Sequence, residues 1–224
     1  MSKKKIAAGI IGGIAALILI IFFVVSGNKK PDPAGYVSAN LHLVFQGDTD
    51  GASQYLDTTS DELEDIYEAG IENFVASYLM GDLDVDSAYT STYGYLLKEI
   101  FAVMRYEVGD AEEVAKDTYK VPVTYQPVDI FTKFIPEIEK ESKKIQQALN
   151  SGAYGEKKED AQVSALQDYL NLAYEKLEMA YLEMEYGEKD TYEITVKVKA
   201  DGTMEVQDNG INTFIERILE LDKL

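Results

Sequence analysis

Close to its N-terminus the chain has a run of apolar residues long enough to cross a membrane. Ile6 to Val25 are twenty residues without a charged or strongly polar side chain. As an α-helix they extend about 30 Å, the thickness of the hydrocarbon core of a bilayer. Helices buried in globular proteins rarely run so far without a polar residue. The sequence therefore predicts one transmembrane helix, and the membrane is the expected partner of residues 6–25.

The length of this run also favours an anchor over a cleaved signal peptide, whose apolar region is usually about 7–15 residues. Val24-Val25-Ser26 is only a weak cleavage pattern. Lysines 3–5 precede the run and Lys29 and Lys30 follow it, and the free amino terminus adds to the charge in front. We therefore expect a single-pass protein of the cell membrane, with a cytoplasmic N-terminus and an extracytoplasmic C-terminal domain.

Three segments follow from this pattern. Residues 1–27 form the expected signal-anchor, and residues 28–34 form a linker whose prolines favour an extended spacer. Residues 35–224 are enough for one good-sized domain or two small ones, and we expect a single domain. Hydrophobic residues make up 46% of the chain and charged residues 27%, which is ordinary globular usage and argues against extensive disorder.

Charge excludes one class of partner. Residues 1–30 hold five lysines and no acid, so the remaining 16 basic and 40 acidic residues give the rest of the chain a net charge of −24. Such a surface repels phosphate backbones, so no nucleic-acid role is expected. The chain has no cysteine, which excludes disulfides, thiolate metal sites and a lipid attached through cysteine.

Helical periodicity accounts for much of the rest of the chain. Residues 35–46 carry apolar side chains on one helical face, and a short helical turn is expected over residues 52–56. Thr59 and Glu62 make a capping box before an amphipathic helix to about Leu79. Asp86 or Ser87 caps a third helix that ends near Phe101.

The periodicity then changes to that of strands. Met104–Val108 and Tyr119–Tyr125 are expected strands, and Pro122 argues for an edge strand or a bulge. Tyr192–Val198 and Met204–Val206 flank an Asp-Gly turn, and a last helix runs over about residues 211–221. Residues 132–186 carry two apolar stripes with a short polar connection, which predicts an inserted antiparallel helical hairpin. The fold class is α+β, with helices packed on a small curved antiparallel sheet.

At this point the chain resembles a group of uncharacterised membrane- or lipid-anchored extracytoplasmic proteins of Gram-positive bacteria. The resemblance rests on GYVSANLHLVFQGD, SDELEDIYEAGIENFVASYL, YKVPVTYQPVDIF and the closing DGTMEV, and it covers most of residues 35–220. It implies a cystatin-like or nuclear-transport-factor-2-like cone fold, from which the long helical hairpin departs. It supplies no activity and no site residues.

The residues offer little for catalysis. His42 is the single histidine, stands between Leu41 and Leu43, and is most simply a structural or surface residue. No Glu-x-x-His pair, phosphate-binding glycine motif or nucleophile elbow is present. Forty acidic residues offer many carboxylate pairs, of which none stands out. We therefore expect a non-enzymatic protein without a catalytic residue or a cofactor.

One weak metal candidate remains. Asp82, Asp84 and Asp86 have the alternating spacing that opens a calcium-binding loop. The match then fails, because Ser87 stands where glycine is needed and Tyr93 where the loop has a bidentate glutamate. The simpler interpretation is an acidic turn whose last aspartate caps a helix.

The sixteen tyrosines suggest a second kind of site. Tyr89, Tyr93, Tyr119 and Tyr125 are candidates for lining an aromatic cleft, although core packing with outward hydroxyls is the simpler interpretation. Three functions follow: an interaction domain for an unknown envelope protein, a small-ligand or sensory module with a tyrosine-lined cleft, and a hydrolase of envelope polymers. The first is the leading hypothesis.

Overall fold

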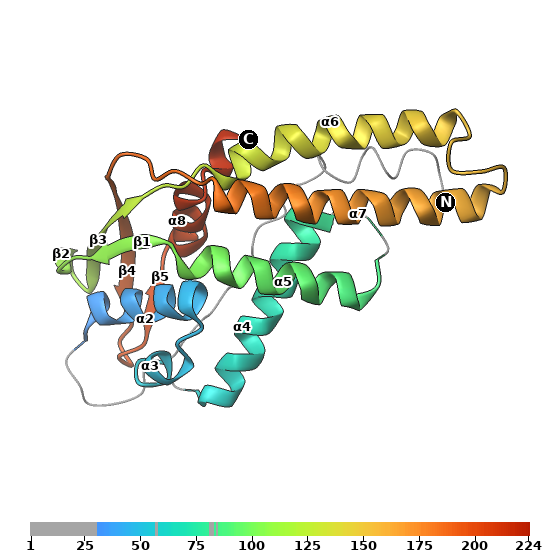
Figure 1. Ribbon diagram of the computed structural model, residues 1–224. Helices are drawn as coiled ribbons and strands as arrows, with labels where there is room; N and C mark the ends of the chain where they lie inside the picture. The colour runs from blue at the N-terminus through green and yellow to red at the C-terminus, as the bar shows by residue number, and fades with distance from the viewer. Residues whose placement is uncertain (1–30, 57, 81–82, 84) are drawn as a thin grey trace.

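The structure is a computed structural model, and it describes residues 31–56, 58–80, 83 and 85–224. Helices lie around and beyond an antiparallel sheet, and a long pair of helices extends to one side (Figure 1). The α+β class predicted from the sequence is confirmed. The predicted membrane helix, residues 6–25, lies outside the described residues. Within the described part of the chain, no helix combines the length and the hydropathy that crossing a membrane requires.

The N-terminal helices form where local chemistry predicts them. Helix α2 begins at Pro33, with the Asp32 carboxylate accepting a hydrogen bond from the Gly35 amide, so the helix takes in the last two residues of the expected linker. Proline is favoured here because the first turn of a helix needs no amide donor. Gly47 ends the helix in the left-handed conformation. Helices α2 and α3 span Pro33–Gln46 and Thr49–Ser53.

The next two helices are capped as expected, and the first of them changes its helical geometry before it ends. Thr59 and Glu62 form the predicted capping box at the start of α4, and Asp86 caps α5. The α-helical geometry of α4 ends at Phe74 and continues as a π-helix, which the apolar periodicity does not distinguish from an α-helix. The bounds are Ser60–Phe74 for α4, Val75–Met80 for the π-helix and Ser87–Ala102 for α5.

The sheet has the strand order β1-β3-β4-β5, and β2 also pairs with β3. All pairs are antiparallel. Strand β2 was not predicted, because every one of its residues is exposed and its sequence therefore lacks apolar alternation. The bounds are Arg105–Val108, Glu112–Ala115, Thr118–Gln126, Asp190–Val198 and Met204–Val206 for β1 to β5.

Of the two expectations for the strand with Pro122, an edge position or a bulge, the edge position is wrong. Strand β3 is central, with β1 and β2 on one side and β4 on the other. Pro122 fits there because it falls between the β1 and β2 pairings, at Gly109, where the chain passes from one strand to the next. The Gly109 amide donates to the Pro122 carbonyl at 2.8 Å. Residues 109–111 stand opposite residues 121 and 122, so the proline lies at a bulge-like interruption between β1 and β2, where a regular ladder donor is not needed.

The predicted helical hairpin is present, as α6 (Ile130–Asn150) and α7 (Lys158–Leu182). It is inserted between β3 and β4, which pair directly with each other from Thr118 to Tyr125. The two ends of the insertion are joined by a bridge between Val128 and Tyr186 and by a 2.8 Å bond from the Gly187 amide to the Pro127 carbonyl. The hairpin is therefore an arm attached at the end of a β-ribbon (Figure 1).

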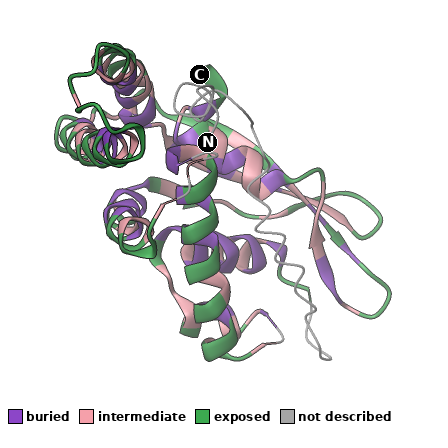
Figure 2. Cartoon of the chain, turned by 90° about the vertical axis from the view of Figure 1, so that its right-hand side faces the viewer, coloured by how far each residue is buried: buried purple, intermediate pink, exposed green. Residues whose placement is uncertain are grey.

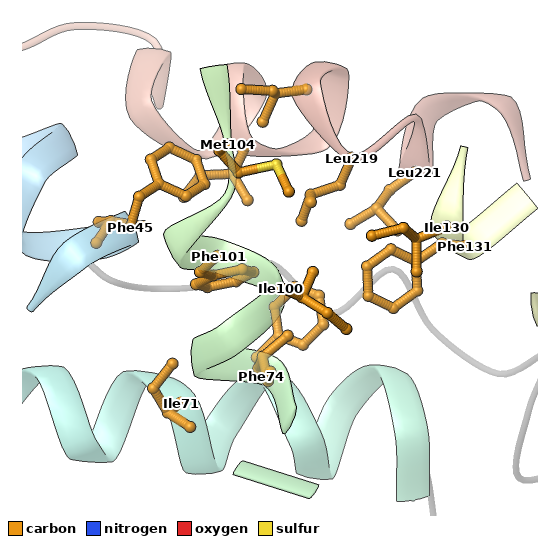
Figure 3. Close-up of a cluster of buried hydrophobic side chains, with 14 of the residues drawn as sticks. Phe45, Ile71, Phe74, Ile100, Phe101, Met104, Ile130, Phe131, Leu219 and Leu221 are labelled. Atoms are coloured by element: carbon orange, nitrogen blue, oxygen red, sulfur yellow. The ribbon is translucent and has the colours of Figure 1, made fainter. Parts of the chain in front are cut away.

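One contiguous core joins the arm, the helices and the sheet. Helix α8, Gly210–Ile218, packs on β4 and places Phe214 against Phe45 and Tyr125. Figure 3 shows Phe74, Phe101 and Phe131 together where α4, α5 and α6 meet. Buried residues face the interior of the molecule, and exposed ones cover the outer sides of the arm (Figure 2).

Candidate functional site

A groove of about 510 Å³ lies where the C-terminal end of α2 meets α3, α4 and α5. Its lining combines aromatic rings with charged side chains. Helix α4 contributes residues one turn apart, and α5 contributes the facing residues. The lining consists of Phe45, Gln46, Gly47, Thr49, Glu64, Tyr67, Glu68, Lys98, Glu99 and Ala102.

Gly47 sets the shape of the groove beside α2. Its φ of +64° is the left-handed conformation, which glycine adopts without the strain that a side chain introduces. A Cβ at this position would lie 3.0 Å from Cε1 of Tyr67. The absence of a side chain therefore lets the α2 helix end and also lets the Tyr67 ring lie directly against the backbone.

Lys98 connects the two walls of the groove. Its Nζ lies 2.5 Å from Oε1 of Glu68, 5.5 Å from the centre of the Tyr67 ring and 5.7 Å from the centre of the Tyr95 ring. Both ring distances are within the range of cation–π attraction. Tyr95 is 71% exposed, which is unusual for a large aromatic side chain. The ammonium group is thus held by one carboxylate and two rings.

The groove is acidic even with Lys98 in place. Glu64, Glu68 and Glu99 face a single lysine among the lining residues, which leaves a net charge of −2 at pH 7. Burial raises the pKa of Tyr67 to about 12, and the neighbouring Glu68 carboxylate adds to this effect. Tyr67 therefore stays neutral at physiological pH and presents its ring to a cation without adding charge.

The four predicted tyrosines occupy separate places. Tyr93 is buried, and its hydroxyl donates to the Leu170 carbonyl at 2.6 Å. Tyr125 is buried on β3, donates to Oδ2 of Asp190 at 3.2 Å, and lines a smaller pocket of about 150 Å³ beside β1. Tyr89 and Tyr119 are half-buried on α5 and β3. None of the four lines the acidic groove.

The calcium candidate is only partly described. Asp82 and Asp84 lie outside the described residues. The carboxylate of Asp86 accepts a hydrogen bond from the Ala88 amide at 2.8 Å, as a helix cap does. Across the part of the chain that the structure describes, no three acidic or histidine side chains gather into a metal-binding group. The ring of His42 is half-buried and lies 6.0 Å from that of Tyr106.

Two tyrosines give a matched test of the packing around these helices and the sheet. We expect Tyr93→Phe to lower the free energy of unfolding by about 1 kcal/mol, because it removes the buried hydrogen bond that the Tyr93 hydroxyl donates to the Leu170 carbonyl. We expect Tyr106→Phe to change it by less than about 0.5 kcal/mol or to raise it, because the buried Tyr106 hydroxyl has no partner among the described residues. Urea denaturation of both variants measures the difference, and equal losses would contradict this account.

Sequence reasoning did not single out the groove. Glu64 and Glu68 are one turn apart on α4, as are Tyr95 and Glu99 on α5, and such spacing is common on solvated helix faces. The site depends on which face of α4 meets which face of α5, and on the glycine that ends α2. Both are tertiary features. The one weak indication of the groove in the sequence was the position of Tyr67 within an acidic stretch of the helix.

Comparison with known proteins shows a similarity in fold. No family model matches the chain, and no curated protein matches it. The fold is similar to the crystal structure of a predicted lipoprotein (ycdA) from Bacillus subtilis subsp. subtilis strain 168, with a TM-score of 0.51 and 18% sequence identity. The match covers 84% of this chain and 56% of that one, so it spans little more than half of the Bacillus protein. At this identity the likeness concerns the fold alone.

Proposed function

We propose that this protein is a non-enzymatic domain held at the outer side of the cell membrane, where its acidic groove binds a cationic partner. The groove of Glu64, Tyr67, Glu68, Lys98 and Glu99 is the observation that carries the proposal. Carboxylates together with an aromatic ring attract and orient a positively charged group. A net charge of −24 beyond residue 30 also speeds the approach of such a partner over a longer range.

The anchor part of the proposal rests on residues 6–25. The similar Bacillus protein is described as a lipoprotein, but a lipid attached through cysteine is impossible in this sequence, which has no cysteine. A transmembrane helix is therefore the means of attachment that we propose. A reporter enzyme fused after Leu224 tests the orientation, because it should be active only outside the cytoplasm. Activity inside the cytoplasm would overturn the extracytoplasmic location.

The non-enzymatic part rests on the sequence. The chain has no cysteine, one histidine and no recognised catalytic motif. It therefore offers few side chains that could act as a nucleophile or a general base. A small-ligand or sensory module remains the alternative. In that case the pocket beside Tyr125 is the site that we propose for the ligand. A hydrolase of envelope polymers is the third hypothesis, and it requires a buried carboxylate pair in a cleft.

Binding to the groove is tested with a ten-residue lysine peptide and two charge-matched triple variants. In the groove variant Glu64, Glu68 and Glu99 become glutamine. In the control variant the exposed Glu156, Glu175 and Glu188 become glutamine, so both proteins lose three negative charges. Titration calorimetry at physiological salt is expected to show about tenfold weaker binding for the groove variant and less than about threefold for the control. Equal losses would show that net charge, and not the groove, binds the peptide.

A further inference from the structure

The groove already holds a cation that belongs to the protein itself. The Lys98 ammonium contacts the Glu68 carboxylate and lies over the rings of Tyr67 and Tyr95. These contacts are made by the end of the side chain, which reaches from α5 to α4. The surroundings of its Nζ therefore show what kind of group this place accepts: a compact primary ammonium ion, between two aromatic faces and a carboxylate.

We infer that the groove recognises a lysine side chain of a partner protein, and that Lys98 occupies the same place when the partner is absent. This inference rests on the proposed function and names the group that the groove binds. The incoming ammonium takes the Glu68 carboxylate and the two tyrosine rings, and Lys98 turns into solvent or toward Glu99, the next residue along α5. Binding is thus a competition between two ammonium groups for one place.

The exposure of the residues suits such an exchange. Side-chain exposure is 28% for Lys98 and 49% for Glu68, and ion pairs in contact with solvent contribute little to stability. Lys98 can therefore leave without disturbing the core. Tyr95 is 71% exposed, and burial of this ring against a partner adds apolar contact that the free protein does not make. Exposed tyrosines of this kind often dominate the affinity of an interface.

Charge also favours exchange over simple loss of Lys98. With Lys98 turned out of the groove, its three glutamates carry a net charge of −3, and the partner's ammonium brings this to −2. The partner's lysine therefore neutralises carboxylates that Lys98 leaves unpaired. A neutral side chain of the same length gains nothing from these groups, so acetylation of the incoming lysine is expected to abolish the interaction.

The experiment uses the full chain in a neutral detergent and the peptide acetyl-Gly-Lys-Gly-amide, with its Nε-acetylated form as the matched probe. Replacing Lys98 by methionine removes the internal competitor and keeps the length of the side chain. We expect Lys98→Met to bind the lysine peptide about threefold to tenfold more tightly than the parent, and neither protein to bind the acetylated peptide. Lys143→Met, at an exposed position on α6, makes the same change of net charge and should alter the affinity by less than about twofold.

Two substitutions at Tyr95 test the role of the ring. Tyr95→Phe keeps the aromatic face and should retain most of the affinity, whereas Tyr95→Leu should lose about threefold to tenfold. Equal affinity of the parent and Lys98→Met proteins, or equal binding of both peptides, would overturn the inference. If the groove variant with three glutamines still differs from its charge-matched control, the proposed function stands and only the lysine-exchange inference fails. If it does not, the groove itself is not the binding site.

Discussion

Replacing Phe214 by alanine is expected to lower the free energy of unfolding by about 3–5 kcal/mol. Its side chain is completely buried. Its ring centre lies 5.2 Å from that of Tyr125, 6.1 Å from that of Tyr106 and 6.2 Å from that of Phe45. These partners come from β3, β1 and α2, so one ring of α8 joins three elements that are distant in the sequence. Removing it leaves a cavity that rigid strands on one side are poorly able to fill.

Urea denaturation followed by circular dichroism measures this loss. The matched control is Tyr95→Ala, which removes an even larger aromatic side chain from an exposed position. Its effect should stay within about 0.5 kcal/mol. If Phe214→Ala also stays within that range, then α8 does not close the core of the sheet as described.

The second large effect is expected at Phe74, the last residue of α4. Its ring is fully buried and lies 4.6 Å from that of Tyr78, 5.5 Å from that of Phe101 and 5.6 Å from that of Phe131. Phe131 belongs to the helical arm, so Phe74 connects α4 and α5 to the insertion between β3 and β4 (Figure 3). We expect Phe74→Ala to cost about 3–5 kcal/mol.

Phe74→Leu provides the graded control, because it keeps most of the apolar contact, and it should cost less than half as much as the alanine variant. Hydrogen exchange adds a spatial test. In Phe74→Ala the amides of the N-terminal half of α6 should exchange faster relative to those of β3. Uniform acceleration through the whole domain would instead mean that the arm and the sheet unfold as one unit.

The sequence predicted those parts of the fold that depend on local chemistry. The capping box at Thr59 and Glu62 was correct because both of its hydrogen bonds are made within one turn. The helical hairpin was correct because each of its helices carries its own apolar stripe. The Asp-Gly turn before β5 was correct because Gly202 has the positive φ that such turns require.

Features that depend on distant contacts were missed. Strand β2 is stabilised by pairing with β3 and has no buried residue of its own. The central position of Pro122 depends on the interruption between β1 and β2 at Gly109, which lies opposite it. The groove was missed for a related reason, since Tyr67 and Lys98 come from different helices and meet only when α4 packs against α5. The tyrosines singled out from the sequence are abundant in the core, where aromatic residues also pack.

The most direct test of a cation-binding groove is a two-dimensional NMR titration of isotope-labelled residues 31–224, which contain the whole described core, with acetyl-Gly-Lys-Gly-amide. We predict saturable shifts of the signals of Tyr67, Tyr95 and Lys98 and of their neighbours on α4 and α5, and we predict that these shifts weaken as salt is added. Shifts confined to the pocket beside Tyr125 or to the helical arm, or no saturable shift at all, would contradict the assignment of function to this groove.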